Sequence, residues 1–153
     1  IELVLSEMAE QVAIRLRRVK KKAKSVHIHI SYSRVESKKS INASKKITPT
    51  QSTKQLTDHV LSLFRSKYDG GAVRSIAVRY DNLIDDNLTI YTLFDDIEAI
   101  EKQRKIDKTL DTIRDKYGFL SVQNGSMLME GSRVKERSKL VGGHAGGMDG
   151  LIW

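Results

Sequence analysis

The stretch Ser25-Val26-His27-Ile28-His29-Ile30-Ser31-Tyr32-Ser33 alternates polar and apolar side chains from end to end. Successive side chains of a β-strand point to opposite faces of its sheet, so this alternation predicts a strand. Its apolar face carries Val26, Ile28, Ile30 and Tyr32, and its polar face carries His27, His29, Ser31 and Ser33. We therefore expect a sheet with one buried face and one polar face.

Two further segments alternate in the same way and supply partners for this strand. A short polar connection leads to residues 41–47, so these two segments are predicted to pair as an antiparallel hairpin, which Pro49 ends. Residues 73–80 form the third strand. The inward residues of these two strands are Ile41, Ala43, Ile47, Ile76 and Val78, and the outward ones are Asn42, Ser44, Lys46, Ser75, Ala77 and Arg79.

Apolar residues at steps of three and four predict three amphipathic helices. The first is expected to end near Lys24, with the basic residues of 15–24 in its last turns. The second follows a capping-box pattern of Ser52 and Gln55 and ends before Gly70-Gly71. The third spans residues 97–117 and ends at Gly118. Their apolar stripes are Leu5, Met8, Val12, Leu16 and Val19; Leu56, Val60, Leu63 and Phe64; and Ile97, Ile100, Ile106, Leu110 and Ile113.

The element order α-β-β-α-β predicts an α+β fold, a two-layer sandwich of an antiparallel sheet and two helices. We expect residues 1–82 to form this domain, 83–96 an acidic linker, 97–117 a helix and 118–153 a partly flexible C-terminal tail. A short strand is expected near an Asn124-Gly125 turn. The glycine-rich residues 142–150 bury too little surface to order themselves.

The distribution of charge points to an anionic partner. The 153-residue chain carries 27 Lys and Arg against 19 Asp and Glu, a net charge of +8. Residues 1–80 hold 17 basic and 6 acidic residues, whereas residues 81–100 hold 6 acidic and no basic residues. A basic domain of this kind favours nucleic acid as its partner, with an anionic membrane surface as the weaker competitor.

Several classes of protein and site are excluded or disfavoured. The absence of cysteine excludes disulfides, thiolate metal sites and cysteine nucleophiles, and fits a cytoplasmic protein. No apolar run approaches the roughly 20 residues that span a bilayer. His27 and His29 lack a third ligand for zinc, and the aspartates of residues 81–96 lie in linkers that would not position two metals. We expect no metal or cofactor in this chain.

Four stretches of the chain resemble the C-terminal region of the Y-family translesion DNA polymerases, in the UmuC/ImpB/MucB/SamB-like branch. They are residues 5–17, 46–50, 73–80 and 141–150. The resemblance implies that residues 1–82 are the little finger, which lays its sheet along the major groove of the primer-template duplex and does no chemistry. The Mg²⁺-binding palm would lie outside this chain, which begins within a helix without an initiator Met and is expected to be an inactive piece of a longer error-prone repair polymerase of the SOS response.

The resemblance also implies which residues contact DNA. The family's strand arginines correspond to Arg74 and Arg79, and its hairpin contacts correspond to Ser44, Lys45 and Lys46. Strand alternation puts Lys45 and Arg74 on the face opposite to that of the polar row, so either they lie at strand ends or the register differs. The full candidate set for DNA binding adds three residues of the polar face: Ser75, His27 and His29.

The chain departs from the family pattern in two places. The family's little finger opens with an extra strand, so we expect a vacancy within the sheet and an unusual sheet, a separate filling segment or self-association through an unpaired edge. The family's clamp-binding peptide, Gln-Leu-x-Leu-Phe, corresponds to residues 90–94, which keep Leu93 and Phe94 but lack Gln. Tyr91, Leu93 and Phe94 are the candidate residues for binding a sliding clamp; in the alternative, Leu93 and Phe94 pack on the domain or on the third helix.

Two alternatives to a DNA grip remain at this point. In one, the third helix and tail form a protein-interaction module that docks on the clamp or on a regulatory subunit. In the other, which the resemblance disfavours, the chain is a free-standing basic nucleic-acid-binding protein.

Overall fold

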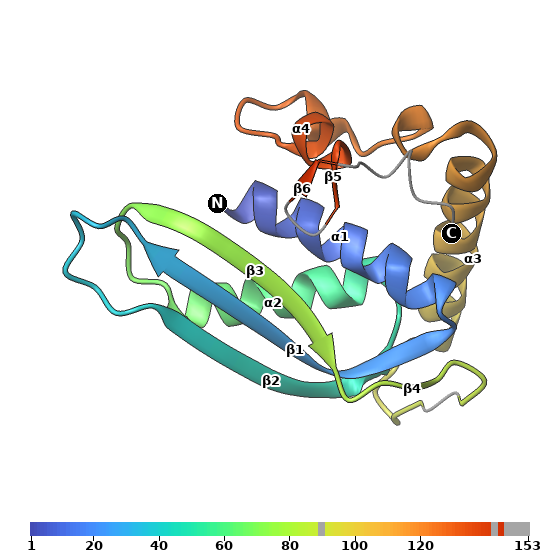
Figure 1. The fold of residues 1–153 in the computed structure, drawn as a ribbon. Coiled ribbons are helices and arrows are strands. Elements are labelled where there is room, and N and C mark those ends of the chain that lie inside the picture. The colour runs from blue at the N-terminus through green and yellow to red at the C-terminus, as the bar shows by residue number, and fades with distance from the viewer. Residues whose placement is uncertain (89–90, 142–143, 146–153) are drawn as a thin grey trace.

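The computed structural model describes residues 1–88, 91–141 and 144–145, and it has the expected α+β architecture (Figure 1). The first unit is built from α1 (Glu2–Arg18), β1 (Lys21–Tyr32), β2 (Ile41–Thr50), α2 (Thr53–Lys67) and β3 (Val73–Asp81). The rest of the described chain contains β4 (Ile84–Asp85), α3 (Ile97–Tyr117), the 3₁₀ turns η1 (Phe119–Ser121) and η2 (Gly125–Leu128), α4 (Val134–Ser138), β5 (Leu140–Val141) and β6 (His144–Ala145).

The sheet has no vacancy between its described strands, so the expected gap is wrong. β1 lies in the centre and pairs antiparallel with β2 on one side and β3 on the other, both over Ser25–Ile30. The two residues of β4 extend the sheet by pairing with Lys21 and Lys22 at the start of β1. Since both long edges of β1 are occupied, a further strand would have to add outside β2 or β3; self-association there stays a prediction.

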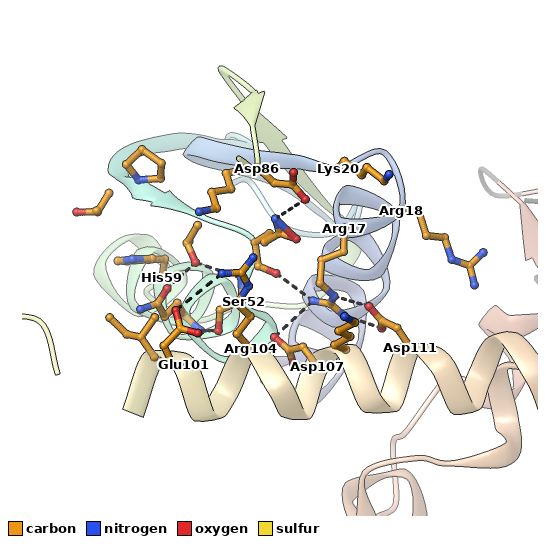
Figure 2. Close-up of a pocket in the computed structure, with 18 of the residues that line it drawn as sticks. Arg17, Arg18, Lys20, Ser52, His59, Asp86, Glu101, Arg104, Asp107 and Asp111 are labelled. Atoms are coloured by element: carbon orange, nitrogen blue, oxygen red, sulfur yellow. Dashed lines mark hydrogen bonds and ion pairs between the residues drawn. The ribbon is translucent and has the colours of Figure 1, made fainter. Parts of the chain in front are cut away.

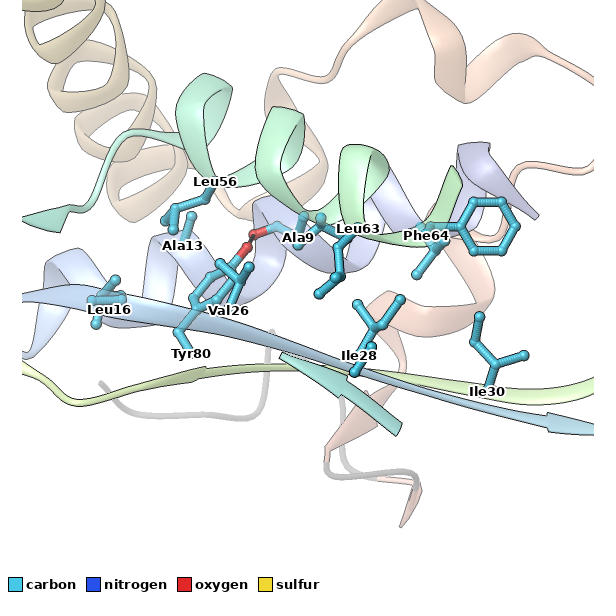
Figure 3. Packing of buried hydrophobic residues seen from close by; sticks show 14 residues of the cluster. Ala9, Ala13, Leu16, Val26, Ile28, Ile30, Leu56, Leu63, Phe64 and Tyr80 are labelled. Atoms are coloured by element: carbon cyan, nitrogen blue, oxygen red, sulfur yellow. Dashed lines mark hydrogen bonds between the residues drawn. The ribbon is translucent and has the colours of Figure 1, made fainter. Parts of the chain in front are cut away.

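Helices α1 and α2 cover one face of this sheet and form the main core with it (Figures 1 and 3). Val26, Ile28 and Ile30 of the central strand have no exposed surface. They pack against residues of both helices, among them Leu5, Ala9, Ala13, Leu56, Val60 and Phe64. The Tyr80 hydroxyl donates a hydrogen bond of 2.9 Å to the Ala9 carbonyl oxygen, and burial raises the pKa of this phenol. The core thus holds the sheet's other face toward solvent.

The helix boundaries were predicted well except at the end of α1. The Ser52 hydroxyl accepts a hydrogen bond from the Gln55 amide at the start of α2, as the capping pattern predicts, and α3 ends before Gly118 as expected. Helix α1 instead ends at Arg18 rather than near Lys24. Val19 and Lys20, whose backbone is left-handed (φ 54°), turn the chain after the helix. The next two lysines, Lys21 and Lys22, belong to β1 and pair with β4 instead of extending the helix.

Two other local expectations are wrong. Pro49 does not end β2, which continues to Thr50, because β2 is an edge strand and its proline need not supply a ladder hydrogen bond. The Asn124-Gly125 pair begins the 3₁₀ turn η2 rather than a strand turn, and the Asn124 side chain accepts a hydrogen bond from the Ser126 amide.

Residues 119–138 fold back onto the side of α1 that faces away from the sheet. Ile14 forms a second small apolar cluster there with Phe119 and Val134. The buried Glu7 carboxylate accepts hydrogen bonds from the Ser132 hydroxyl (2.6 Å) and the Arg133 amide (3.0 Å) at the start of α4. Most of the glycine-rich segment 142–150 lies outside the described residues.

Candidate nucleic-acid interface

The open face of the sheet carries rows of polar side chains that run across three strands. The register places His27 of β1 between Ser44 of β2 and Arg79 of β3. Directly opposed residues of antiparallel strands share a face, with Cβ atoms about 5 Å apart. The neighbouring rows are Lys46, Ser25 and Asp81; Asn42, His29 and Ala77; and Ser31 with Ser75. Ser44, Lys46 and Arg79 therefore lie on one surface.

This face is open to solvent. Both helices of the first unit lie on the opposite side of the sheet (Figure 1). Ser44, Lys46, Ser75 and Arg79 are exposed, and the central His27 is partly exposed. The surface can therefore receive a ligand without rearrangement of the core.

Hydrogen bonds between strands order part of this face. His29 Nδ1 and Asn42 Oδ1 lie 2.7 Å apart, and the hydroxyl oxygens of Ser31 and Ser75 lie 2.5 Å apart. Arg79 Nε lies 3.0 Å from the Asp81 carboxylate, but an exposed pair of this kind contributes little energy. Among the described residues this contact uses Nε, and no hydrogen bond from the two terminal nitrogens of Arg79 is present there.

The remaining two candidates, Lys45 and Arg74, do not follow the polar rows. Lys45 stands opposite the buried Val26, so its backbone position faces the helical side of the sheet. The pKa of His59 on α2 is lowered mainly by burial and secondly by the positive charge of Lys45. Arg74 is the extra residue where the register shifts between Ser31 and Tyr32, and such a bulge re-aims a side chain relative to its strand.

Much of the positive charge on α1 is occupied by α3, which sequence reasoning missed. Arg17 Nε and Nη2 donate to the two carboxylate oxygens of Asp111 at 2.6 and 2.9 Å (Figure 2). Asp107 lies 3.6 Å from Arg17 Nη1 and accepts a hydrogen bond from the Thr53 amide at the start of α2. Burial disfavours the charged guanidinium, but Asp111, Asp107 and Glu10 outweigh it and raise the pKa of Arg17. The sequence signal for this contact was the spacing of Asp107, Asp111 and Asp115, which recur every four residues and so share one side of the helix.

A cavity of about 900 Å³ lies beside this contact, between α3, the start of α2 and the ends of β1 and β2 (Figure 2). Its walls carry both signs of charge, since Lys22, His59 and Arg104 are accompanied by Asp86 and Glu101. Burial first, and Arg104 second, lower the pKa of Lys22. This balance of charges gives the cavity no preference for an anionic ligand.

The candidate clamp-binding residues lie between the sheet unit and α3. Leu93 is 99% exposed and Phe94 is 97% exposed, so the alternative that they pack on the domain or on the third helix is wrong. Tyr91 is less exposed, and its hydroxyl donates a 2.8 Å hydrogen bond to Glu101 Oε1 of α3. Ile90 lies outside the described residues. The structure thus presents Leu93 and Phe94 as an apolar pair without contacts in the core.

The described part of the chain has neither a metal site nor a membrane-spanning helix. No group of three or more His, Asp or Glu side chains in this part of the chain is placed to hold a metal ion. No described helix combines the length and apolarity needed to cross a membrane.

Comparison with known proteins shows one family model and several curated relatives to which the chain is similar. The model of the impB/mucB/samB family C-terminal domain matches residues 1–93. Over 145 residues, 94% of this chain, it is 34% identical to the putative UV-damage repair protein UvrX of Bacillus subtilis and 28% identical to DNA polymerase IV 2 of Halalkalibacterium halodurans. These alignments cover 34% and 35% of the two relatives, so the chain spans about a third of their length. No solved structure matches it significantly.

Proposed function

The chain belongs to the impB/mucB/samB family of Y-family DNA polymerases, and from this membership we propose that its open sheet face grips the primer-template duplex of an error-prone translesion polymerase. The observation that carries the proposal is the row of Ser44, His27 and Arg79 across three strands, with the exposed Lys46 in the next row. In this role the chain acts as a little finger in the cytoplasm, on nucleoid DNA, and polymerisation with its Mg²⁺ belongs to other parts of the protein.

The chemistry of this face suits contacts to phosphates rather than to base edges. Arginine and lysine supply charge, and serine, histidine and asparagine supply neutral hydrogen bonds to phosphate and sugar oxygens. Contacts of this kind fix the position of a duplex but carry no direct sequence information. A polymerase that must hold damaged template benefits from such a grip, since the lesion does not alter the phosphates being held.

The first prediction concerns salt. If about four phosphates are neutralised, the log-log slope of DNA affinity against salt is roughly −3 to −4, which is about a hundredfold loss between about 50 and 200 mM salt. Arg79→Ala should reduce the magnitude of this slope by about one, because one phosphate contact is lost. Fluorescence anisotropy with a labelled primer-template duplex measures both quantities.

Lys54 provides the matched control for this experiment. Like Arg79 it is an exposed cation paired with an aspartate, but it lies on α2, on the helical side of the sheet. Lys54→Ala should leave the slope unchanged. An affinity indifferent to salt, or an equal loss of slope in the Lys54 and Arg79 variants, would overturn the DNA grip.

A second candidate function is docking on the sliding clamp, favoured by the exposure of Leu93 and Phe94. Two adjacent large apolar side chains in water are typical anchors for a hydrophobic pocket. The acidic residues beside them have local roles: the Asp95 side chain accepts a hydrogen bond from the Thr92 amide, and that of Asp96 accepts one from the Ala99 amide at the start of α3. These bonds hold the chain on either side of the apolar pair.

The corresponding prediction is a loss of clamp affinity on truncation of this pair. The Leu93→Ala/Phe94→Ala variant should bind purified bacterial sliding clamp at least about 30-fold more weakly, the effect of removing a hot spot of about 2 kcal/mol. Leu128→Ala is the control, since Leu128 is also highly exposed (83%) but lies in η2. Equal affinity of the double variant and the unaltered chain in calorimetry would exclude this docking mode.

A further inference from the structure

Helix α3 is attached to the rest of the chain through its polar side. Asp107 and Arg114 are its buried residues, with 3% and 5% of their surfaces exposed. Arg114 Nη2 donates to Glu10 Oε1 of α1 at 2.8 Å, and its Nε donates to the Val122 carbonyl oxygen at 3.1 Å. Together with the Arg17 contacts described above, these bonds fix which side of α3 faces the domain.

Ile106, Leu110, Ile113 and Tyr117 lie on an adjoining side of the helix, where Leu110 and Ile113 are partly exposed, whereas Ile100 lines the cavity beside the domain. The apolar periodicity predicted the helix itself, and two residues of its apolar stripe, Ile97 and Ile106, are 51% and 42% exposed. Tyr117, one turn beyond Ile113, is 67% exposed. None of Ile106, Leu110, Ile113 and Tyr117 packs against either of the two apolar clusters of the described chain.

These four residues have the spacing of a coiled-coil seam. Ile106, Leu110, Ile113 and Tyr117 follow one another at intervals of four, three and four residues, and Ala99 and Gln103 continue the pattern toward the start of the helix. A repeat of this kind presents a continuous apolar strip to a partner helix. The helix spans 21 residues and lies at the margin of the described fold (Figure 1).

The charges beside the seam differ on its two sides. On one side, Asp107 and Arg114 occupy the flanking positions, and both are committed to the chain's own domain. On the other side, Lys102 and Lys116 occupy them, with Thr109 between. No ion pair to either lysine is present among the described residues; Lys116 Nζ instead lies 5.2 Å from the centre of the Tyr117 ring.

This asymmetry selects the partner. A second copy in antiparallel orientation would bring Lys102 and Lys116 of one helix against the same lysines of the other, and like charges at these positions disfavour pairing. A second copy in parallel orientation would need the flank that is already buried against the domain. We propose that the seam of α3 binds an amphipathic helix of another protein, one whose apolar strip is bordered by Asp and Glu. This surface is separate from the sheet face and from Leu93 and Phe94.

The test uses two synthetic helical peptides with the full 153-residue chain. Both peptides have about three heptads with Ile and Leu in the seam; one has Glu at the flanking positions and the other has Lys. In fluorescence anisotropy, the Glu peptide should bind and the Lys peptide should bind at least about tenfold more weakly. The Lys102→Glu/Lys116→Glu variant should reverse this preference.

Two further variants separate the seam from a general effect of charge or stability. Ile113→Glu should abolish binding of the Glu peptide, because it places a charge in the apolar strip. Lys105→Glu should leave binding unchanged, since Lys105 is an exposed lysine of α3 away from the seam. Thermal melts establish that each variant is folded. Equal binding of both peptides, an unreversed preference in the double variant, or a dimer of the unaltered chain in sedimentation that Ile113→Glu dissociates would each overturn the proposal.

Discussion

Replacing Arg17 with methionine is expected to lower the free energy of unfolding by about 3–5 kcal/mol, the usual cost of removing one partner from a buried ion pair. The side chain of Arg17 is 11% exposed and those of Asp107 and Asp111 are 5% and 16% exposed. Methionine fills a similar volume but leaves both carboxylates partly desolvated without their cation. Urea unfolding monitored by circular dichroism measures the loss, and hydrogen exchange over residues 97–117 shows whether α3 detaches.

Two comparisons make this prediction specific. Lys54→Met removes an exposed ion pair with Asp58 and should change the unfolding free energy by less than about 1 kcal/mol. Adding Asp111→Met to Arg17→Met should restore part of the loss, because one of the uncompensated charges is removed. If the Arg17 and Lys54 variants are equally stable, the Arg17 contacts do not attach α3 as described.

The second large effect is expected in the centre of the sheet. Ile28→Ala should cost about 2–5 kcal/mol, since it opens a cavity at a position with no exposed surface. Ile28 lies between Ala43 of β2 and Val78 of β3 and faces α1 and α2, so several elements would have to move to close the cavity. The loss should appear as a lower midpoint of urea unfolding with an unchanged slope.

The adjacent residue serves as the control. His27 occupies the same strand and the same region of the sheet but points to the open face, so His27→Ala should change stability by about 0.5 kcal/mol or less. The proposed DNA grip predicts the reverse order for DNA affinity. His27→Ala should bind the duplex more weakly, whereas Ile28→Ala should keep its DNA affinity below its melting temperature. A His27 variant as unstable as Ile28→Ala would show that this side of the sheet is not open.

The strands were predictable because polar and apolar side chains alternate along them. This alternation arises directly from the burial of one face of the sheet. Ile28 and His27 were assigned to the correct sides from sequence alone. The end of α1 was not predicted correctly, because a run of lysines and arginines has no apolar period. Lys21 and Lys22 of this run pair with β4. The strand order around β1 also required the structure, since hairpin signals do not say where the third strand pairs.

The environment of α3 shows where periodicity misleads. Its boundaries were predicted correctly from its apolar residues and Gly118. The side by which it attaches was not, because hydrophobic patterning cannot represent a fork of hydrogen bonds such as that between Arg17 and Asp111. For Lys45 both explanations of its opposite parity, a strand end or a different register, are wrong, since it lies within β2 and faces the helical side of the sheet. For Arg74 the register does differ, through a bulge that depends on local pairing.

From its sequence, the side of α1 that faces away from the sheet resembles a solvent-exposed helix surface. Glu7 and Gln11 on this side are nevertheless only 5% and 4% exposed, because residues 119–138 cover them. The family match stops at residue 93, well short of that cover. A protein shortened to the matched region would hydrate these groups and strip Ile14 of its apolar neighbours. Helix α1 therefore packs against the sheet unit on one side and against residues 119–138 on the other, so substitutions in residues 119–138 should also alter the packing of α1.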